Sequence, residues 1–200
     1  TMFTLERLDR ERRRLRSRII VATKLLAKTM REGRWELYHG PEDTVEDLDA
    51  KPVALSGRCD IRISRKNGKG IEHAVVDVKY GSRKYRNQLT DGLAVQLAAY
   101  SRRIGKGKFW PVTAILAVKS GELMTVHNKA FPGSIQVGTE DEKTVWAKFE
   151  NSVREYIVQL EKGEIPVAED GKSAVGMRTT LECDCNYCMF SFFCRYETAA

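Results

Sequence analysis

The sequence HAVVDVKYG, residues 73–81, reads as a buried strand that ends in two charged residues. Side chains alternate between the two faces of a strand, so Asp77 and Lys79 project to the same side, roughly 6.6 Å apart along the chain. Charged side chains are rarely buried without a partner or a task. The segment therefore predicts a strand in a sheet, with either a structural ion pair or a chemical site at its end.

Context distinguishes this pair from similar ones, because a chain with 27 acidic residues forms acid-x-Lys triplets by chance. The other such triplets lie in loop-like sequence or at the start of a helix. The triplet from Asp77 to Lys79 alone follows a β-branched run on an expected strand. We therefore take it as the candidate site.

A second carboxylate is expected beside this strand. Residues 52–64 alternate in polarity, and the turn-forming sequence at 66–70 joins them to a strand at 71–80, which predicts a β-hairpin. Asp60 then lies on the neighbouring strand, on the side of Asp77. Two carboxylates that share a site repel each other unless a cation lies between them, and Mg²⁺ suits such oxygen ligands. A structural ion pair between strands remains the alternative.

Helices and further strands surround this hairpin. We expect a long amphipathic helix over residues 5–32 and a second helix that runs through Leu89 and Leu97 and ends at Gly105. A third helix is expected over 140–162, where Thr139 and Glu142 suggest a capping box. The first helix takes its apolar stripe from Leu8, Leu15, Ile19, Ala22, Leu26 and Met30. Strands are expected at 112–118 and directly after it, as a second hairpin. Residues 35–50 are expected to be an acidic connector with a short strand at its start. The order predicts an α/β fold with a mixed central sheet flanked by helices.

Charge and cysteine usage divide the chain into three parts. The formal net charge of +7 falls entirely within a basic helix at 1–35, since acidic and basic residues balance in the rest. Residues 36–162 form the expected core, and 163–200 a connector with a cysteine-rich tail. A basic helical arm suits a phosphate backbone, although a solvated helix face is the alternative. No membrane-spanning run or secretion signal is evident, so we expect a soluble cytoplasmic protein that does not bind a membrane.

Three short motifs together resemble a known family. GRCD at 57–60, DVK at 77–79 and QLAAY at 96–100 occur in the order and context of the PD-(D/E)XK nuclease superfamily, in its RecB-like branch. The resemblance implies a restriction-endonuclease-like core. It also implies a metal site at Asp60, Asp77 and Val78, with Mg²⁺ or Mn²⁺ as cofactor. Lys79 would serve catalysis, and Gln96 and Tyr100 would position the site and the DNA strand.

The family also has an acidic or histidine metal ligand before the first core strand, and this sequence offers no clear equivalent. The candidates are Glu32, Glu36 and His39, of which His39 is preferred because a neutral imidazole binds divalent metals. The long first helix resembles a segment of larger helicase-nucleases. A helicase or another module of a longer chain or complex is therefore an open alternative as partner.

The cysteines near the end of the chain suggest a second metal centre. Cys185, Cys188 and Cys194 have the spacing C-x2-C-x5-C, which lets thiolates meet at one metal. This arrangement is similar to the C-terminal triple of iron-sulfur RecB-like nucleases, including AddB-type subunits and CRISPR adaptation nucleases, and implies a 4Fe-4S cluster. Zn²⁺ and reduced thiols are the alternatives. The fourth ligand is either Cys183 or a residue upstream of this sequence, and Cys59 is expected to be a small core residue.

The leading functional hypothesis is a metal-dependent DNA nuclease in DNA repair, recombination or defence, acting on single-stranded DNA or double-stranded ends. The expected DNA-binding residues are Arg12, Arg13, Arg83, Lys84 and Arg86. Two other classes remain open. One is a catalytically impaired DNA-binding or scaffolding module of the same fold, and the other is a zinc-stapled interaction domain.

Overall fold

The structure is a computed structural model that describes residues 2–38, 44–50, 53–68 and 70–163. The chain divides into two compact units, 1–146 and 147–200. The first unit contains both sheets, and the described part of the second is the remainder of the last helix. Among the helices of the described residues, none is long and apolar enough to cross a membrane.

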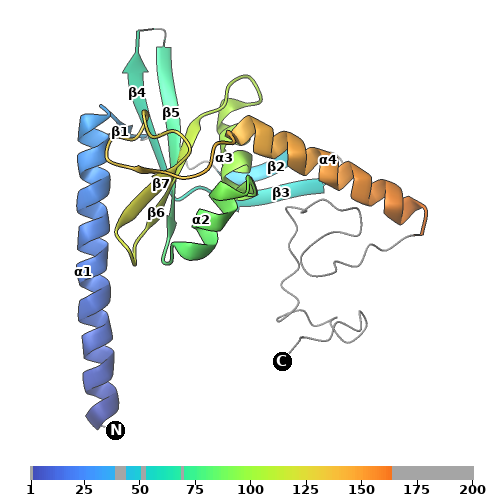
Figure 1. Cartoon of the computed structure of the whole chain (residues 1–200). Helices are drawn as coiled ribbons and strands as arrows, with labels where there is room; N and C mark the ends of the chain where they lie inside the picture. The colour runs from blue at the N-terminus through green and yellow to red at the C-terminus, as the bar shows by residue number, and fades with distance from the viewer. Residues whose placement is uncertain (1, 39–43, 51–52, 69, 164–200) are drawn as a thin grey trace. The chain divides into compact units, whose positions relative to one another are not determined.

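A mixed sheet forms the centre of the first unit (Figure 1). The neighbours β5 and β6 are parallel, whereas β4 and β7 pair antiparallel with β5 and β6 respectively. In sheet order the strands are β1 (Glu36–Leu37), β4 (Ile61–Asn67), β5 (Gly70–Lys79), β6 (Val112–Ala117), β7 (Glu122–Thr125) and β8 (Ile135–Gln136). A separate two-stranded sheet pairs β2 (Thr44–Ala50) with β3 (Val53–Arg58).

Helices cover both faces of the central sheet. Helix α1 (Met2–Glu32) packs on one face through Ala22 and Leu26. Helices α2 (Arg83–Thr90) and α3 (Val95–Gly105) lie on the other face, where they form the crossover between parallel strands β5 and β6. The predicted α/β fold, a mixed sheet flanked by helices, is confirmed. The cysteine-rich tail of that prediction lies outside the described residues.

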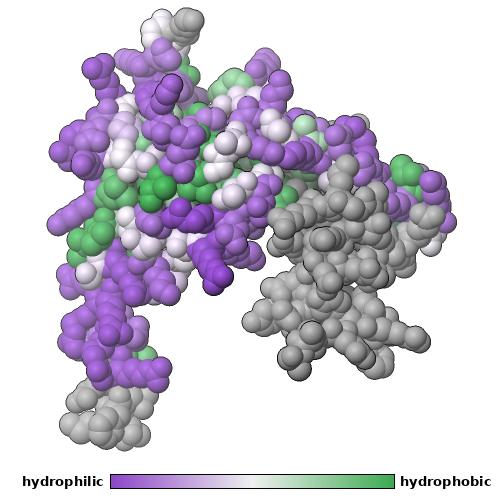
Figure 2. Space-filling model, viewed as in Figure 1, coloured by the Kyte–Doolittle hydropathy of each residue, from purple (hydrophilic) through white to green (hydrophobic). Residues whose placement is uncertain are grey.

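Most of α1 is exposed to solvent, although its apolar residues form a stripe that the sequence analysis expected to be buried. Leu8, Leu15 and Ile19 are between 42% and 61% exposed, and the buried part of the helix begins at Ala22. Figure 2 shows hydrophilic residues over much of the visible face of α1. The periodicity predicted the helix correctly, but the sheet is only long enough to cover its C-terminal part.

The chain bends at Asp60, where the sequence predicted one continuous strand over 52–64. The pattern is instead divided into β3, which pairs with β2, and β4, which forms the hairpin with β5. Residues 35–50 were expected to be a connector with one short strand, but they contain two strands, β1 and β2. The bend is stabilised by a side chain, because the Asp60 carboxylate accepts a hydrogen bond from the Val78 amide at 2.7 Å.

The helix predicted to run through Leu89 and Leu97 to Gly105 is divided into α2 and α3. Gly92 lies between them in the left-handed region, with a φ of 66°. A Cβ at this position would also collide with the carboxylate of Glu140. The interruption therefore favours glycine for its backbone conformation. The predicted end at Gly105 is confirmed.

Helix α4 (Glu142–Glu161) begins with a buried carboxylate rather than with the capping box expected from Thr139 and Glu142. Asp141 caps the helix, since its Oδ1 accepts a hydrogen bond from the Thr144 amide at 2.9 Å. Glu142 is 5% exposed and accepts hydrogen bonds from the Thr113 amide, the Thr113 hydroxyl and His127 Nε2, at 2.9, 2.6 and 2.8 Å. This carboxylate fixes the first turn of α4 to β6.

We expect the stability of the protein to depend on pH through His127. The hydrogen bond to Glu142 raises the pKa of His127 above its ordinary value of 6.5, in spite of the opposing effect of burial. The His127 side chain therefore binds a proton more tightly in the folded state than in the unfolded chain. The stabilisation is complete below about pH 6.5 and is lost as the pH rises through the raised pKa.

Unfolding free energies of the wild type and His127→Gln, measured by urea denaturation from pH 5.5 to 8.5, check this expectation. The wild-type advantage should shrink as the pH rises, by an amount within the roughly 1.5–3 kcal/mol of a hydrogen bond to a charged group. A constant difference across this range would show that the charge on His127 plays no part.

Candidate active site

The site lies where β5 ends, between its neighbours β4 and β6. Alternate residues of β5 face opposite sides of the sheet. Ala74 and Val76 belong to the core under α1, whereas Asp77 is the register partner of Ile115, which packs with α2 and α3. Asp77 and Lys79 therefore face the side of α2 and α3, as the strand period predicts.

Asp77 and Lys79 form a buried ion pair. Lys79 Nζ lies 3.0 Å from Asp77 Oδ2, and the two side chains are 20% and 2% exposed. Burial raises the pKa of Asp77, and the Asp60 carboxylate raises it further, although the hydrogen bond from Lys79 opposes both effects. Burial alone would lower the pKa of Lys79, but the hydrogen bond and the charge of Asp77 outweigh it, so that its pKa is raised. Lys79 is therefore an ammonium ion at neutral pH.

Asp60 lies at the bend before β4 and faces Asp77. The last register pair of the hairpin is Ile61 with Val76, so the next step brings Asp60 opposite Asp77. Asp60 Oδ2 accepts a hydrogen bond from the Val78 amide at 2.7 Å, which fixes the orientation of the carboxylate. The predicted pairing of the two carboxylates is thus present in the geometry, although it depends on the bend rather than on a continuous strand.

The backbone N–H and C=O groups of Val78 point toward Asp60. The carbonyl of Lys79 accepts a hydrogen bond from Val118 on the β6 side, at 2.8 Å. Successive residues of a strand point their backbone groups to opposite sides, so the N–H and C=O of Val78 point toward β4 and Asp60. The hydrogen bond from Val78 to Asp60 agrees with this direction. Two carboxylates therefore lie side by side, and strand alternation directs one backbone carbonyl toward the same edge. Carboxylate and carbonyl oxygens are the ligands that Mg²⁺ and Mn²⁺ prefer.

Gln96 and Tyr100 connect α3 to the segment that carries Asp60. The amide of Gln96 donates a hydrogen bond to the Tyr100 hydroxyl at 2.7 Å, and that hydroxyl donates to the Arg58 carbonyl at 2.8 Å. Burial raises the pKa of Tyr100, and the charges of Asp77 and Asp60 add to this. Tyr100 therefore remains a neutral donor that fixes the end of β3, two residues before Asp60.

The candidates for an earlier metal ligand do not join this group within the described residues. Glu32 lies 3.8 Å from Lys28, and Glu36 is the register partner of Ser64, four residues from Asp60. His39 lies outside the described residues. Among the residues that the structure describes, no group of three or more His, Cys, Asp or Glu side chains could hold a metal ion.

The predicted cysteine ligands Cys183, Cys185, Cys188 and Cys194 also lie outside the described residues. Cys59 is a half-buried, reduced cysteine between β3 and β4.

The predicted DNA-binding residues have different surroundings. Arg83 and Lys84 are exposed, whereas Arg86 Nη2 lies 3.2 Å from Glu122 Oε1. Arg12 and Arg13 are exposed on α1, and Arg13 pairs with Asp9 one turn earlier.

Two residues near the site were missed by the sequence analysis. The ring of Tyr85 lies 5.5 Å from Lys79 Nζ, and Lys119 lies beside Tyr80, whose carbonyl accepts its amide hydrogen bond at 2.8 Å. The sequence offers only a weak indication of either residue. Lys119 comes just after an expected strand, and Tyr85 comes near the start of a helix.

Comparison with family models identifies the class of protein. The model of the PD-(D/E)XK nuclease superfamily matches residues 3–195, which is nearly the whole chain. The chain therefore belongs to the PD-(D/E)XK nuclease superfamily, whose members are generally hydrolases of nucleic acids that use divalent metals such as Mg²⁺. No curated protein and no solved structure gives a significant match.

Proposed function

We propose that this protein is a metal-dependent deoxyribonuclease of the RecB-like branch, which hydrolyses phosphodiester bonds in DNA repair, recombination or defence. The observation that carries the proposal is that Asp60 and Asp77 lie opposite each other across the β4–β5 hairpin, beside the Lys79 ammonium ion. The order of the three sequence motifs supports the assignment to the RecB-like branch.

A divalent cation fits the acidic end of β5. The Asp77 carboxylate is 2% exposed and its pKa is raised by burial and by Asp60, so a cation with two charges would relieve an unfavourable arrangement. Asp60, Asp77 and the Val78 carbonyl would hold Mg²⁺ or Mn²⁺, with His39 as the proposed additional ligand. When bound, such an ion would polarise the phosphate and lower the pKa of a water molecule.

Lys79 acts as a fixed cation in this proposal. Its pKa is raised, which disfavours a role in removing a proton from water. An ammonium ion held 3.0 Å from Asp77 can instead orient the attacking water and stabilise the charge that develops on the phosphate. Gln96 and Tyr100 act as positioning residues, because their hydrogen bonds end on the backbone before Asp60.

Exposed cations beside the site support a path for the DNA backbone. Arg83, Lys84 and Lys119 surround an open pocket of about 440 Å³, which Tyr85 also lines. Tyr85 in turn contacts Lys79, so this pocket adjoins the proposed catalytic group. Such cations attract phosphates without regard to sequence.

The basic helix α1 passes close to the same end of the sheet. Arg18 Nη1 donates a hydrogen bond to the Tyr80 hydroxyl at 2.6 Å, directly after Lys79 in the chain. Because Arg12 and Arg13 lie on the same helix as Arg18, one to two turns further from the site, we propose that they bind a more distant part of the DNA.

Digestion of labelled single-stranded and double-stranded DNA, with Mn²⁺ or Mg²⁺ against EDTA, tests the function. We expect cleavage that depends on the metal. The competing function is a DNA-binding or scaffolding module, favoured by the lack of a third acidic, histidine or cysteine side chain at the site among the described residues. Tight DNA binding without cleavage under every metal condition would support that alternative.

We further propose that Cys185, Cys188 and Cys194, with Cys183 or an upstream cysteine, bind a 4Fe-4S cluster of structural function. Their spacing supports this proposal, since short Cys-x2-Cys pairs are typical ligands of such clusters and of zinc.

Protein purified without oxygen should be brown and contain iron and sulfide. The variant Cys188→Ser should lose both and become less stable. Colourless wild-type protein with stoichiometric zinc would identify a zinc site, and metal-free protein of full stability would contradict both metals. Cys183→Ser decides the fourth ligand, because loss of the cluster would assign it to Cys183.

A further inference from the structure

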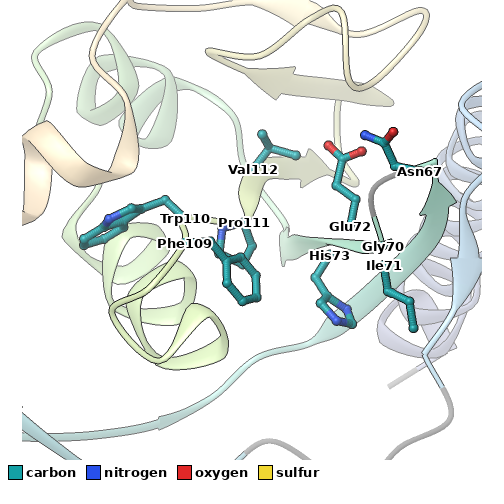
Figure 3. Close-up of a pocket in the computed structure, with 9 residues that line it drawn as sticks. All are labelled: Asn67, Gly70, Ile71, Glu72, His73, Phe109, Trp110, Pro111 and Val112. Carbon is teal, nitrogen blue, oxygen red and sulfur yellow. The ribbon is translucent and has the colours of Figure 1, made fainter.

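A second open pocket lies toward the other end of β5 from the two carboxylates. It has a volume of about 320 Å³. Figure 3 shows Ile71 and His73 from β5, and Phe109, Trp110 and Pro111 from the loop between α3 and β6. We call it the Phe109 pocket. None of its lining residues belongs to the candidate active site.

Aromatic rings are the main feature of this pocket. The ring of Phe109 is nearly parallel to that of His73, with 6.3 Å between their centroids and 25° between their planes, and His73 contacts Tyr38 edge-on. Phe109 is nevertheless 46% exposed, and Ile71 is 65% exposed. The protein thus presents a flat apolar surface to solvent on a loop, where loop residues are usually polar.

The segment that carries Phe109 is rich in positive charge. Arg103, Lys106 and Lys108 lie in or beside the same loop and are exposed, and none takes part in an ion pair among the described residues. One lining residue is acidic, Glu72, and its charge is balanced by Arg65 at 2.8 Å. Exposed rings together with unpaired cations suit a ligand that joins flat rings by phosphates. Single-stranded nucleic acid has this chemistry, whereas the bases of a duplex are stacked and inaccessible.

The Phe109 pocket is aligned with the candidate active site. His73 and Asp77 lie on the same side of β5, four residues apart, which corresponds to about 13 Å. Helix α3 spans the same interval, since Gln96 and Tyr100 are near its start and Gly105 at its end packs against Pro111 and Phe109. Because stacked nucleotides rise about 3.4 Å each, and unstacked ones more, a few nucleotides would cover the separation.

We propose that the Phe109 pocket binds an unpaired base of the DNA strand whose backbone enters the site at Asp60 and Asp77. The protein then acts on single-stranded DNA or on ends with a single-stranded overhang. This inference rests on the proposed nuclease function for its substrate, and its test does not depend on cleavage.

The test measures binding in EDTA, so that no cleavage occurs. Two probes are compared, an oligothymidylate and an abasic oligonucleotide of the same length and charge. Phe109→Ala should weaken binding of the oligothymidylate by about 10-fold, because stacking of one base contributes on the order of 1–3 kcal/mol. Binding of the abasic strand should not change. Phe109→Tyr keeps a ring of the same size and should retain wild-type affinity for both probes.

Tryptophan fluorescence gives an independent measurement. Trp35 and Trp146 are buried, at 4% and 1% exposed, whereas Trp110 is half-buried and lines the pocket. Oligothymidylate should therefore quench the emission of Trp110, and Trp110→Phe should remove most of the change. The abasic strand should quench much less.

Equal affinity of wild type for the two probes, with no effect of Phe109→Ala, would overturn the inference even if the protein cleaves DNA. Tighter binding of duplex than of single-stranded DNA would also overturn it. Base-dependent binding by a protein that never cleaves DNA would support the Phe109 pocket while contradicting the proposed nuclease function.

Discussion

Asp77→Asn should lower the rate of DNA hydrolysis by at least about 100-fold, because it removes a proposed metal ligand that contacts the reacting groups. The substitution preserves the shape of the side chain but removes its charge. Asp60→Asn and Lys79→Ala should produce losses of similar size. Binding of DNA should survive in each case, since the proposed backbone contacts of Arg83 and Lys84 are unchanged. Cleavage rates and binding affinities with Mn²⁺ provide the measurement.

A matched control separates this effect from a general loss of negative charge. Glu155 is an exposed carboxylate on α4, so Glu155→Gln makes the same chemical change outside the site. It should leave cleavage unchanged. If Asp77→Asn cleaves DNA as fast as the wild type does, the assignment of the site is wrong.

Glu142→Ala should lower the free energy of unfolding by about 3–5 kcal/mol, the usual cost of removing one partner from a buried, hydrogen-bonded charge pair. The Thr113 amide and hydroxyl and His127 would lose their acceptor, and Thr113 is only 2% exposed, so its groups have little access to water. Urea denaturation provides the measurement. The loss should be largest at low pH, where His127 is charged.

Glu142→Gln is the matched variant for this experiment. Its amide oxygen can still accept a hydrogen bond from Thr113, so it should cost less than Glu142→Ala. A loss below about 1 kcal/mol for Glu142→Ala would show that water replaces the carboxylate, and that α4 is fixed to β6 by its apolar contacts instead.

The sequence by itself determined the elements with a strong local period. The strand that ends at Asp77 and Lys79, the end of α3 at Gly105 and the first helix, predicted over residues 5–32 and observed over Met2–Glu32, all follow from apolar spacing and end signals. The motifs GRCD, DVK and QLAAY also indicated the superfamily, because each places particular residues on an expected strand or helix and the three occur in the family's order. Gln96 and Tyr100 are four residues apart in the last motif, which is the spacing that brings two side chains to one face of a helix, here α3.

Tertiary structure alone decided where the chain bends and which partners polar groups choose. The division of residues 52–64 at Asp60 depends on a hydrogen bond to Val78, 18 residues away, and Glu142 binds Thr113 rather than its own helix end. The exposure of Leu15 is likewise a tertiary property, because the buried part of α1 begins only at Ala22. Periodicity reports which face of an element is apolar, but a polar side chain can satisfy its hydrogen bonds locally or far along the chain. That choice depends on the distances that the fold creates.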